Sequence, residues 1–304
     1  MNKSGYRSGA SSDCEVPMTL PWFLKISAKI VLSRLPIRYD AWRRLNLFRA
    51  GGMDDPQTAY NVYQMHCRAA GFDRREDYTV LELGPGDSML TALFAKSAGA
   101  ARSILVDQSA LASAKPELFA AADAMLRRMG LLTPEIGRLE TAETILERLN
   151  CRYMTGGLAS LKSLPDCSVD FIFSNAVIEH VRKSDFAEMA RELHRVMTPD
   201  GVASHWIDYR DHLGFALNNM RFSEIVWESD FMANSGFYTN RMPAHEVQAQ
   251  FARAGFSVVV HDSMMWPGGL PTPQAAMSEP FASMDDKELM VMTNWLLLRK
   301  RKNS

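Results

Sequence analysis

The sequence predicts an α/β fold built on a doubly wound sheet, and three observations lead to it. A short apolar run at 78–83 is stopped by glycines and followed by a helix-like stretch at 89–98. A second apolar, partly β-branched run at 103–107 is followed by a stretch of helical composition at 111–129. The same alternation continues along the chain, and strands that alternate with helices at this spacing are typical of such sheets.

The remaining elements follow in order. The apolar runs predict five further strands, at 152–154, 169–174, 202–207, 256–261 and 289–298. Helical periodicity predicts helices at 134–150, 184–197 and 244–254. Residues 197–201 are expected to form a turn, because Pro199 lacks a backbone donor and Gly201 tolerates positive φ.

The chain divides into three parts. Residues 1–17 are mostly small and polar, which predicts a disordered tail. Apolar residues recur at helical spacing over 18–75, which predicts an N-terminal helical extension before the α/β domain at 76–300. Within that domain, 208–243 is too long for a simple connection and combines aromatic residues with arginines. This composition suits a lid over a substrate, or alternatively a packed insertion.

The composition excludes several classes of protein. Of 304 residues, 47% are hydrophobic and 23% are charged, and a formal charge of -1 gives no general attraction to nucleic acid or anionic lipid. The four cysteines form no CxxC pair, so neither a disulfide framework nor a metal site is predicted. The apolar stretch 18–36 is interrupted by three basic residues, so we expect no membrane insertion and a cytoplasmic protein.

A glycine-rich loop follows the first strand and predicts a cofactor site. Its glycines, Gly84 and Gly86, allow close approach of a ligand to the backbone, and the next helix offers free N–H groups. A dinucleotide would need a third glycine where Met89 stands. The acidic Glu82 and Asp87 would repel a pyrophosphate, whereas they suit the cationic amino-acid end of S-adenosylmethionine.

Asp107 strengthens the prediction of a nucleoside-bearing cofactor. It ends the second strand, 21 residues after Gly86, where a carboxylate can accept two hydrogen bonds from ribose hydroxyls. An isolated Asp after a strand is more often a turn residue, but its spacing from the glycine loop favours the ribose role here.

The sequence resembles the class I S-adenosylmethionine-dependent methyltransferases over most of 78–300. The matching segments are 80–86, 106–107, 161–181, 195–201 and 254–256. The resemblance implies a Rossmann-like, seven-stranded, doubly wound sheet whose last strand is antiparallel. It also implies a methyltransferase that uses S-adenosyl-L-methionine as cofactor.

The resemblance further implies which residues bind this cofactor. The glycine loop and its flanking acid would hold the methionine part, the segment after the second strand the ribose, and the segment after the third strand the adenine. By position these residues are Glu82, Gly84, Pro85, Gly86, Asp107, Gln108, Gly157 and Leu158. Many relatives carry an Asp near Gly157, which this sequence lacks. Asn175 is expected close to the donor methyl group.

Catalytic candidates cluster after the fifth strand, at the edge where open α/β sheets bind ligands. A hydroxyl acceptor needs a base, and the ordinary pKa of histidine suits this role. We expect His212 or His205 as the base, with Asp208 or Asp211 supporting it. Such Asp-His pairs also cap loops without any catalytic role. Glu179 and His180 are expected to form part of the scaffold.

A fainter resemblance, carried by 30–36, 51–54, 207–212 and 238–241, is to bacterial methyltransferases of surface-polysaccharide and small-molecule tailoring. It implies O-methylation of a sugar or similar polar small molecule. The candidate substrate-binding residues are Arg210, Arg221, Tyr238 and Arg241. The N-terminal helices would then cover the acceptor pocket.

Several alternatives remain at the level of sequence. They are N-methylation of a small amine, a non-catalytic cofactor-binding scaffold, and a nicotinamide oxidoreductase. A nucleic-acid substrate is not expected, because residues 174–177 lack the proline-containing motif of base methylation and no basic stripe with aromatics is present. The sequence does not indicate an oligomeric state.

Overall fold

The computed structural model describes residues 23–24, 26–27, 30, 52–137 and 140–302. The tail predicted at 1–17 and most of the first half of the predicted extension lie outside these residues. The described part of the extension includes α3 (Pro56–Ala70), which packs against the sheet. This helix begins where Asp55 accepts a hydrogen bond from the Thr58 N–H (2.8 Å) and ends at Gly71, whose φ is 79°.

Seven strands form one sheet in the order β3-β2-β1-β4-β5-β7-β6. Their bounds are β1 Tyr78–Leu83, β2 Ala100–Val106, β3 Cys151–Met154, β4 Val169–Asn175, β5 Met197–Asp208, β6 Phe256–Met265 and β7 Val291–Lys300. β1 to β5 pair with one another in parallel, and β7 runs antiparallel to both β5 and β6. The predicted fold class is therefore confirmed.

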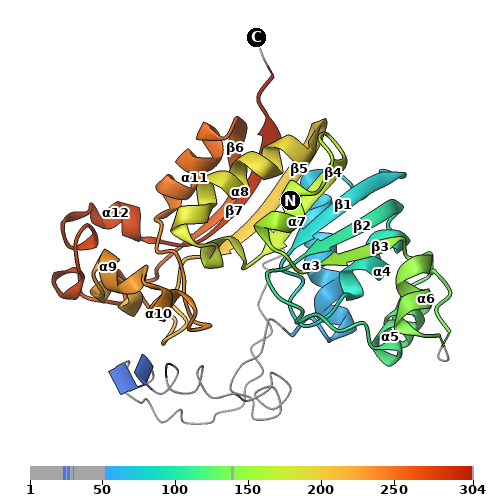
Figure 1. Cartoon of the computed structure of the whole chain (residues 1–304), viewed down its shortest axis with the longest axis horizontal. Coiled ribbons are helices and arrows are strands. Elements are labelled where there is room, and N and C mark those ends of the chain that lie inside the picture. Colours follow the sequence, from blue (N-terminus) through green and yellow to red (C-terminus); the bar gives the residue numbers. More distant parts are fainter. Residues whose placement is uncertain (1–22, 25, 28–29, 31–51, 138–139, 303–304) are drawn as a thin grey trace.

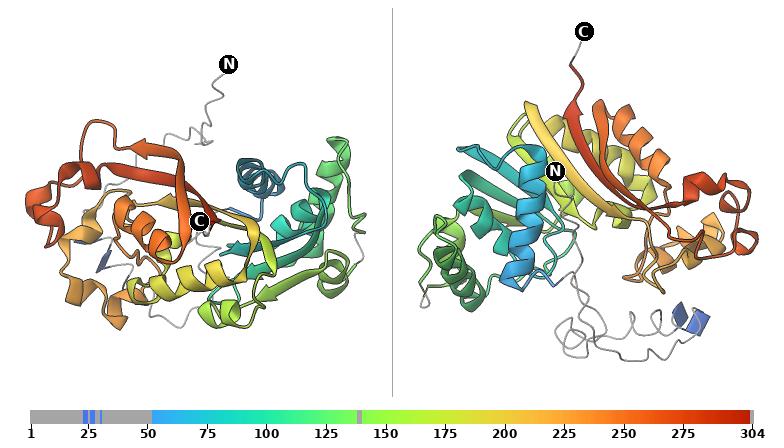
Figure 2. Two further views of the ribbon diagram at one scale, coloured as in Figure 1. Left: turned by 90° about the horizontal axis from the view of Figure 1, so that it is seen from above. Right: turned by 180° about the vertical axis from the view of Figure 1, so that it is seen from behind.

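Helices cover both faces of the sheet. α3, α4 (Leu90–Ser97) and α5 (Pro116–Arg128) pack in one hydrophobic cluster on one face. α7 (Leu158–Lys162), α8 (Lys183–Val196) and α11 (Ala244–Arg253) cover the other face, as Figures 1 and 2 show. α6 (Ala142–Arg148) precedes the edge strand β3.

Alternation along the strands explains these two layers, because successive side chains of a strand point to opposite faces. In β1, Val80 packs with the α3, α4 and α5 cluster, whereas Leu81 and Leu83 pack with the α7, α8 and α11 cluster. In β4, Phe171 and Phe173 likewise face α3. Both faces are buried, as parallel sheets require.

A projecting part lies at the carboxyl ends of β4 and β5 (Figure 1). The predicted lid 208–243 contains η2 Asn218–Arg221, α9 Glu224–Trp227 and α10 Asp230–Ala233. The lid packs against the segment between β6 and β7, which contains η3 Gln274–Ala276, η4 Phe281–Ser283 and α12 Asp286–Leu289. The two are linked by the Ser278 N–H, which donates to the Met220 carbonyl (2.8 Å).

Several predicted element bounds differ from the structure, and the helix expected at 134–150 is confined to 142–148. The turn expected at 197–201 is already strand, because Met197 pairs with Val169. β6 continues to Met265, and the last strand begins at Val291 because α12 occupies 286–289. Among the described residues, no helix is both long and apolar enough to span a membrane.

Candidate active site

The predicted glycine loop lies at the carboxyl end of β1, between β2 and β4, where the strand order reverses and open α/β sheets bind ligands. Gly84 and Gly86 have φ of 63° and 72°, which favours glycine, and Pro85 between them is buried. The Gly84 N–H donates to the Val106 carbonyl (2.8 Å). A Cβ at Gly84 would lie 2.6 Å from Cγ2 of Val177, so the loop packs tightly against the segment after β4.

Glu82 differs from the charged loop residue that the sequence suggested. It is buried and accepts a hydrogen bond from the Thr91 hydroxyl of α4. Burial raises the pKa of Glu82 to about 8, so the carboxyl group holds its proton near neutral pH. Glu82 lies two residues after Val80, so both side chains point to the same face of β1, the face that α4 covers. A direct ionic contact with a cationic ligand therefore does not fit its position.

Asp87 connects the glycine loop to the N-terminal extension. Its Oδ1 accepts a hydrogen bond from the Met53 N–H (3.0 Å), and the Ser88 hydroxyl donates to the Met53 carbonyl. Both Asp87 and Met53 are buried. The residues before α3 therefore dock on the loop, a contact that the sequence analysis missed.

Asp107 and Gly157 come together at the carboxyl ends of β2 and β3. The Gly157 N–H donates to the Asp107 carbonyl (2.8 Å). The Asp107 carboxylate accepts from the N–H groups of Gln108 (2.7 Å) and Ser109 (3.3 Å), and burial raises its pKa. Gly157, with φ 52°, is the residue before α7, which begins at Leu158.

His205 lies in the core. It is 0% exposed, its Nδ1 is 2.8 Å from the Ser174 hydroxyl, and its ring stacks on Phe251 at 5.5 Å and 3°. Burial lowers its pKa to about 3. The prediction of His205 as a base therefore does not fit its position. His205 is two residues from both Ala203 and Ile207, so the three side chains share the face of β5 that α11 covers. This spacing in the sequence indicates that His205 is buried.

Both predicted supporting acids already have structural partners. Asp211 is buried, and its carboxylate accepts the N–H groups of Leu213 (3.0 Å) and Gly214 (2.9 Å) and also that of Asn218. It therefore shapes the loop after β5. Asp208, which ends β5, forms an ion pair with Arg210 (2.7 Å).

His212 instead meets His180, which the sequence analysis assigned to the scaffold. The two Nε2 atoms are 3.1 Å apart, and the rings stack with centroids 4.9 Å apart at 13°. Nδ1 of His180 is 2.8 Å from the Tyr238 carbonyl. His180 lies three residues after Val177, which packs on Gly84. The histidine pair therefore lies near the rim formed by β4, β5 and the glycine loop.

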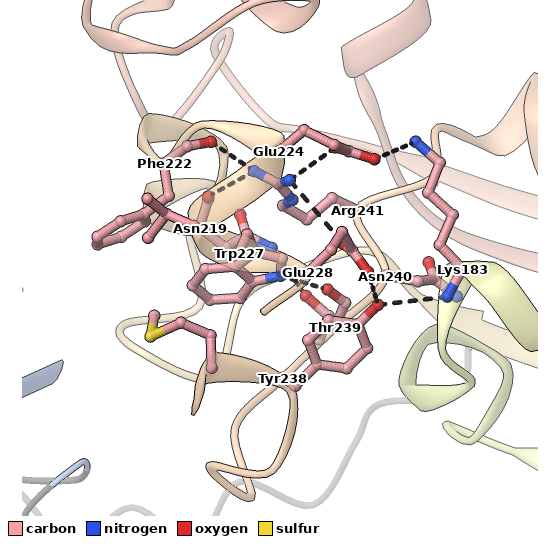
Figure 3. A network of polar contacts seen from close by, with 12 residues as sticks. Lys183, Asn219, Phe222, Glu224, Trp227, Glu228, Tyr238, Thr239, Asn240 and Arg241 are labelled. Atoms are coloured by element: carbon pink, nitrogen blue, oxygen red, sulfur yellow. Dashed lines mark hydrogen bonds and ion pairs between the residues drawn. The ribbon is translucent and has the colours of Figure 1, made fainter. Parts of the chain in front are cut away.

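Arg241 and Tyr238 hold the lid together (Figure 3). The Arg241 guanidinium is buried, donates to the Phe222 carbonyl (2.6 Å) and pairs with Glu224 (2.8 Å). The Tyr238 hydroxyl donates to Glu228 (2.7 Å). The prediction that Arg241 and Tyr238 bind substrate does not fit these buried positions, because their polar groups are engaged within the lid.

The other two predicted substrate residues are only partly buried. Arg210 pairs with Asp208, and its guanidinium lies 5.2 Å from the centre of the Phe215 ring. Nε of Arg221 donates to the Asn218 side chain (3.2 Å). Asn175 ends β4, the strand that pairs with β1 before the glycine loop.

Comparison with known proteins identifies one matching family. The model of a methyltransferase domain matches residues 81–204, which include the glycine loop, Asp107 and β4. A search of curated proteins finds no match.

Solved structures give distant likenesses. The YcgJ protein of Bacillus subtilis is 18% identical, with a TM-score of 0.45 over 80% of this chain and 100% of that chain. A 1,6-didemethyltoxoflavin-N1-methyltransferase of Burkholderia thailandensis is 14% identical, with a TM-score of 0.44 over 94% and 92%. An S-adenosylmethionine-dependent methyltransferase of Mesorhizobium loti is 16% identical, with a TM-score of 0.39 over 74% and 92%. Likenesses this weak say nothing about the substrate.

The strand order and the family match agree. The sheet is doubly wound with an antiparallel last strand, as predicted, and the matched residues contain the glycine loop at its switch point. The chain therefore carries a methyltransferase domain at residues 81–204, and S-adenosylmethionine is the cofactor that the resemblance implies for this domain.

Proposed function

We propose that this enzyme transfers a methyl group to a hydroxyl of a small polar acceptor, such as a sugar. The observation that carries the proposal is the His180–His212 pair, with Nε2 atoms 3.1 Å apart at the rim of the sheet. A hydroxyl loses its proton during transfer, so it benefits from a positioned base, and histidine is suited to that role near neutral pH.

The cofactor site is proposed from the residues at the same edge. Backbone groups of Gly84, Pro85 and Gly86 would hold the methionine part, and Asp107 with Gln108 the ribose. Gly157 and Leu158 would line the adenine, and Asn175 would lie near the transferred methyl group. The positive φ of Gly84 and Gly86 and the half-buried Asp107 carboxylate fit a nucleoside-bearing ligand. Bound S-adenosylmethionine would supply a methyl group already activated on a sulfonium.

The chain's own residues then have two tasks. They must hold the acceptor oxygen about 3 to 3.5 Å from the methyl carbon and exclude water. We propose that His212 takes the acceptor proton and that the lid 208–243 closes over the acceptor. Arg210 and Arg221 remain candidates for an anionic group of the acceptor, because both are partly exposed.

The N-terminal extension is proposed to complete the acceptor pocket. Ile26 packs into the lid cluster with Leu213, Trp227 and Phe237. At its other end, Met53 docks on the glycine loop through Asp87. Contacts with both the lid and the cofactor loop support a role in covering the site between them.

The test is transfer of an isotope-labelled methyl group to a panel of sugars and a panel of small amines. We expect methylated sugars, and we expect His212→Asn to lower turnover by about 10²- to 10⁴-fold without loss of S-adenosylhomocysteine binding. His245→Asn is the control, because His245 is exposed and lies on α11.

Other outcomes would separate the alternatives. Methylation of amines alone would favour the N-methyltransferase alternative and contradict the proposal. Cofactor binding without transfer to any acceptor would favour the non-catalytic scaffold. If the His212→Asn variant keeps the full turnover of the wild type, His212 is not the base.

A further inference from the structure

We propose that the cavity between the lid, α12 and the segment after β4 takes one uncharged hydroxyl group of the acceptor, and that Glu179 is the residue that recognises this group. The inference rests on the proposed function, because it places the acceptor of that reaction. It gives a binding role to a residue that the sequence analysis assigned to the scaffold.

The cavity is lined by residues from three parts of the chain. Glu179 comes from η1 (Ile178–His180), which follows β4, and Leu289 comes from α12. The lid supplies Met220 and Thr239, among others. The space that a water-sized group can occupy is about 20 Å³, and the hollow with the solvent at its mouth measures about 360 Å³. There is therefore room inside for one hydroxyl group, with the rest of a ligand at the mouth.

Glu179 has one carboxyl oxygen in use and one without a partner. Its Oε1 accepts a hydrogen bond from the N–H of Asp208 at the end of β5 (3.3 Å). Its Oε2 is buried and has no hydrogen-bond partner among the described residues, and the whole residue is only 3% exposed. A buried polar atom without a partner is unfavourable for folding. Because Glu179 lines the cavity, a polar group of a ligand placed there would supply the missing partner.

The charges in the cavity walls favour an uncharged group. A cationic group would lie beside the buried guanidinium of Arg241, which is also in the wall. An anionic group would find Arg241 already paired with Glu224 (2.8 Å) and would lie beside the carboxylate of Glu288. Burial raises the pKa of Glu179 well above its ordinary value, so its carboxyl group is protonated and can donate as well as accept.

A hydroxyl group matches these walls, because it can both donate and accept a hydrogen bond. Thr239 offers it a second contact. The Thr239 hydroxyl accepts from the side-chain amide of Asn219 (2.8 Å) and has its own hydrogen to donate. An apolar group of the same size would leave Oε2 of Glu179 without a partner. Since one hydroxyl is held here and another receives the methyl group, the acceptor class is a neutral molecule with at least two hydroxyl groups.

The cavity lies next to the residues proposed for the transfer. Glu179 precedes His180, whose Nε2 is 3.1 Å from Nε2 of His212. The N–H of Asn240 in the lid donates to the Glu179 carbonyl (2.7 Å), and the Asn240 side chain donates to the Ile178 carbonyl (2.9 Å). An acceptor anchored at Glu179 would therefore be held on a connection that the lid fixes, beside the proposed base.

The first test detects the occupant of the cavity and needs no known acceptor. Met220 and Met242 both line the cavity, so their methyl groups are probes in protein labelled with ¹³C-methyl methionine. Met220→Leu and Met242→Leu assign their signals among the 19 methionines. Ethylene glycol, ethylammonium and acetate are added in turn as neutral, cationic and anionic ligands of similar size. We expect Overhauser contacts to both methyl groups from ethylene glycol alone, and none to Met125 on α5.

Variants of Glu179 show whether its carboxyl group holds the ligand. Glu179→Leu should abolish the contacts from ethylene glycol, whereas Glu179→Gln should keep them, because an amide both donates and accepts. Glu82→Leu is the matched control, since Glu82 is also buried with a raised pKa but accepts a hydrogen bond from Thr91 of α4. If Glu179→Leu does not fold, the contrast between the three ligands in the wild type still decides the inference.

The second test uses the sugar that the labelled-methyl assay identifies, together with its monodeoxy analogues. We expect the loss of one particular hydroxyl to raise the KM of the wild type about tenfold, with kcat little changed. Glu179→Leu should raise the KM of the complete sugar by a similar factor and should not distinguish it from that analogue, because groups in direct contact are not additive. The affinity of Glu179→Leu for S-adenosylhomocysteine should match that of the wild type.

The inference and the proposed function fail separately. Contacts from water alone, or from ethylammonium or acetate in place of ethylene glycol, would overturn the hydroxyl site whatever the enzyme methylates. Equal KM values for the sugar and all its deoxy analogues would overturn the role of the site in binding the acceptor. Full turnover of His212→Asn overturns the proposed base alone. Methylation of amines alone overturns the proposed function, and with it the assignment of this site to the acceptor.

Discussion

At Gly84 two separate constraints exclude a side chain. Its φ of 63° is rarely adopted by other residues. In addition, a Cβ added at Gly84 would lie only 2.6 Å from Cγ2 of Val177. The first constraint could be predicted from the sequence as a glycine turn. The second could not, because it depends on how the segment after β4 folds back over the loop.

We predict that Gly84→Ala destabilises the protein by about 1–3 kcal/mol more than Gly130→Ala and weakens S-adenosylhomocysteine binding. Gly130 is a matched control, with φ 70° but nothing within 4 Å of its Cβ. Denaturant unfolding and calorimetric titration measure both effects. The double variant with Val177→Ala should recover stability, and equal losses at Gly84 and Gly130 would contradict the packing argument.

Residue roles were harder to predict than residue positions. The sequence placed Asp107, Gly157 and Asn175 at strand ends, and the structure has them there. Glu82 and His205 were expected at the site because of their residue types, although the alternation of each strand places them against helices. Asp211 looked catalytic, but its oxygens are used by backbone N–H groups that only the folded loop brings together.

At the level of elements, the lid is a small packed unit with Arg241 at its centre. The guanidinium binds two carbonyl oxygens, pairs with Glu224 and lies 5.5 Å from the centre of the Trp227 ring (Figure 3). The lid and packed-insertion interpretations of 208–243 are therefore compatible. The arginine and aromatic residues that suggested substrate binding are partly what gives the segment a core.

We predict that Arg241→Lys loosens the lid by about 1–3 kcal/mol, because a lysine cannot satisfy both carbonyls and the carboxylate. Hydrogen exchange should show lost protection over 218–241 and unchanged protection in β1 and β4. Arg182→Lys is the control, since Arg182 pairs with Asp230, which is 85% exposed, and such pairs contribute little. Equal protection in Arg241→Lys and the wild type would show that the guanidinium does not hold the lid.

Strand prediction succeeded where a short apolar run ended at a glycine or a polar residue, as at β1 and β4. It failed at the antiparallel edge, because the four β6 residues beyond His261 are exposed and lack an apolar pattern. The segment before β7 contains short helical turns whose side chains pack with Leu217 and Met220 of the lid. Such long-range packing leaves no local pattern in the sequence.

For the whole molecule, buried ionisable groups make stability depend on pH in opposing ways. His66 and His205 are 0% exposed and burial lowers the pKa of each to about 3. In the unfolded chain these histidines bind protons near pH 6.5. The two neutral buried rings therefore contribute fully to folding stability above that pH, and this contribution is lost as pH falls toward 3. The pKa of Glu82 is raised to about 8, so its protonated carboxyl contributes most to folding stability below pH 4.5. This contribution is lost as pH rises toward 8.

We predict that the stability gap between wild type and His205→Asn narrows by about 2 kcal/mol between pH 6.5 and pH 5. The wild type loses the contribution of the neutral buried ring over this range, whereas the variant has none to lose. Urea unfolding at several pH values measures the gap, with His245→Asn as the exposed control. A gap that stays constant with pH would mean that His205 can be protonated in the folded protein.

The central claim for the whole molecule is that the carboxyl ends of β1 and β2 bind S-adenosylmethionine. The most direct measurement is calorimetric titration of S-adenosylhomocysteine into the wild type, Asp107→Ala and Asp262→Ala, with NAD as the competing ligand. Asp262 is a matched control, because each carboxylate accepts the N–H of the next residue (2.7 Å at Asp107, 2.9 Å at Asp262). We predict binding of S-adenosylhomocysteine alone, weakened by about 1–3 kcal/mol in Asp107→Ala and unchanged in Asp262→Ala. Binding of NAD instead, or unchanged affinity in folded Asp107→Ala, would contradict the account.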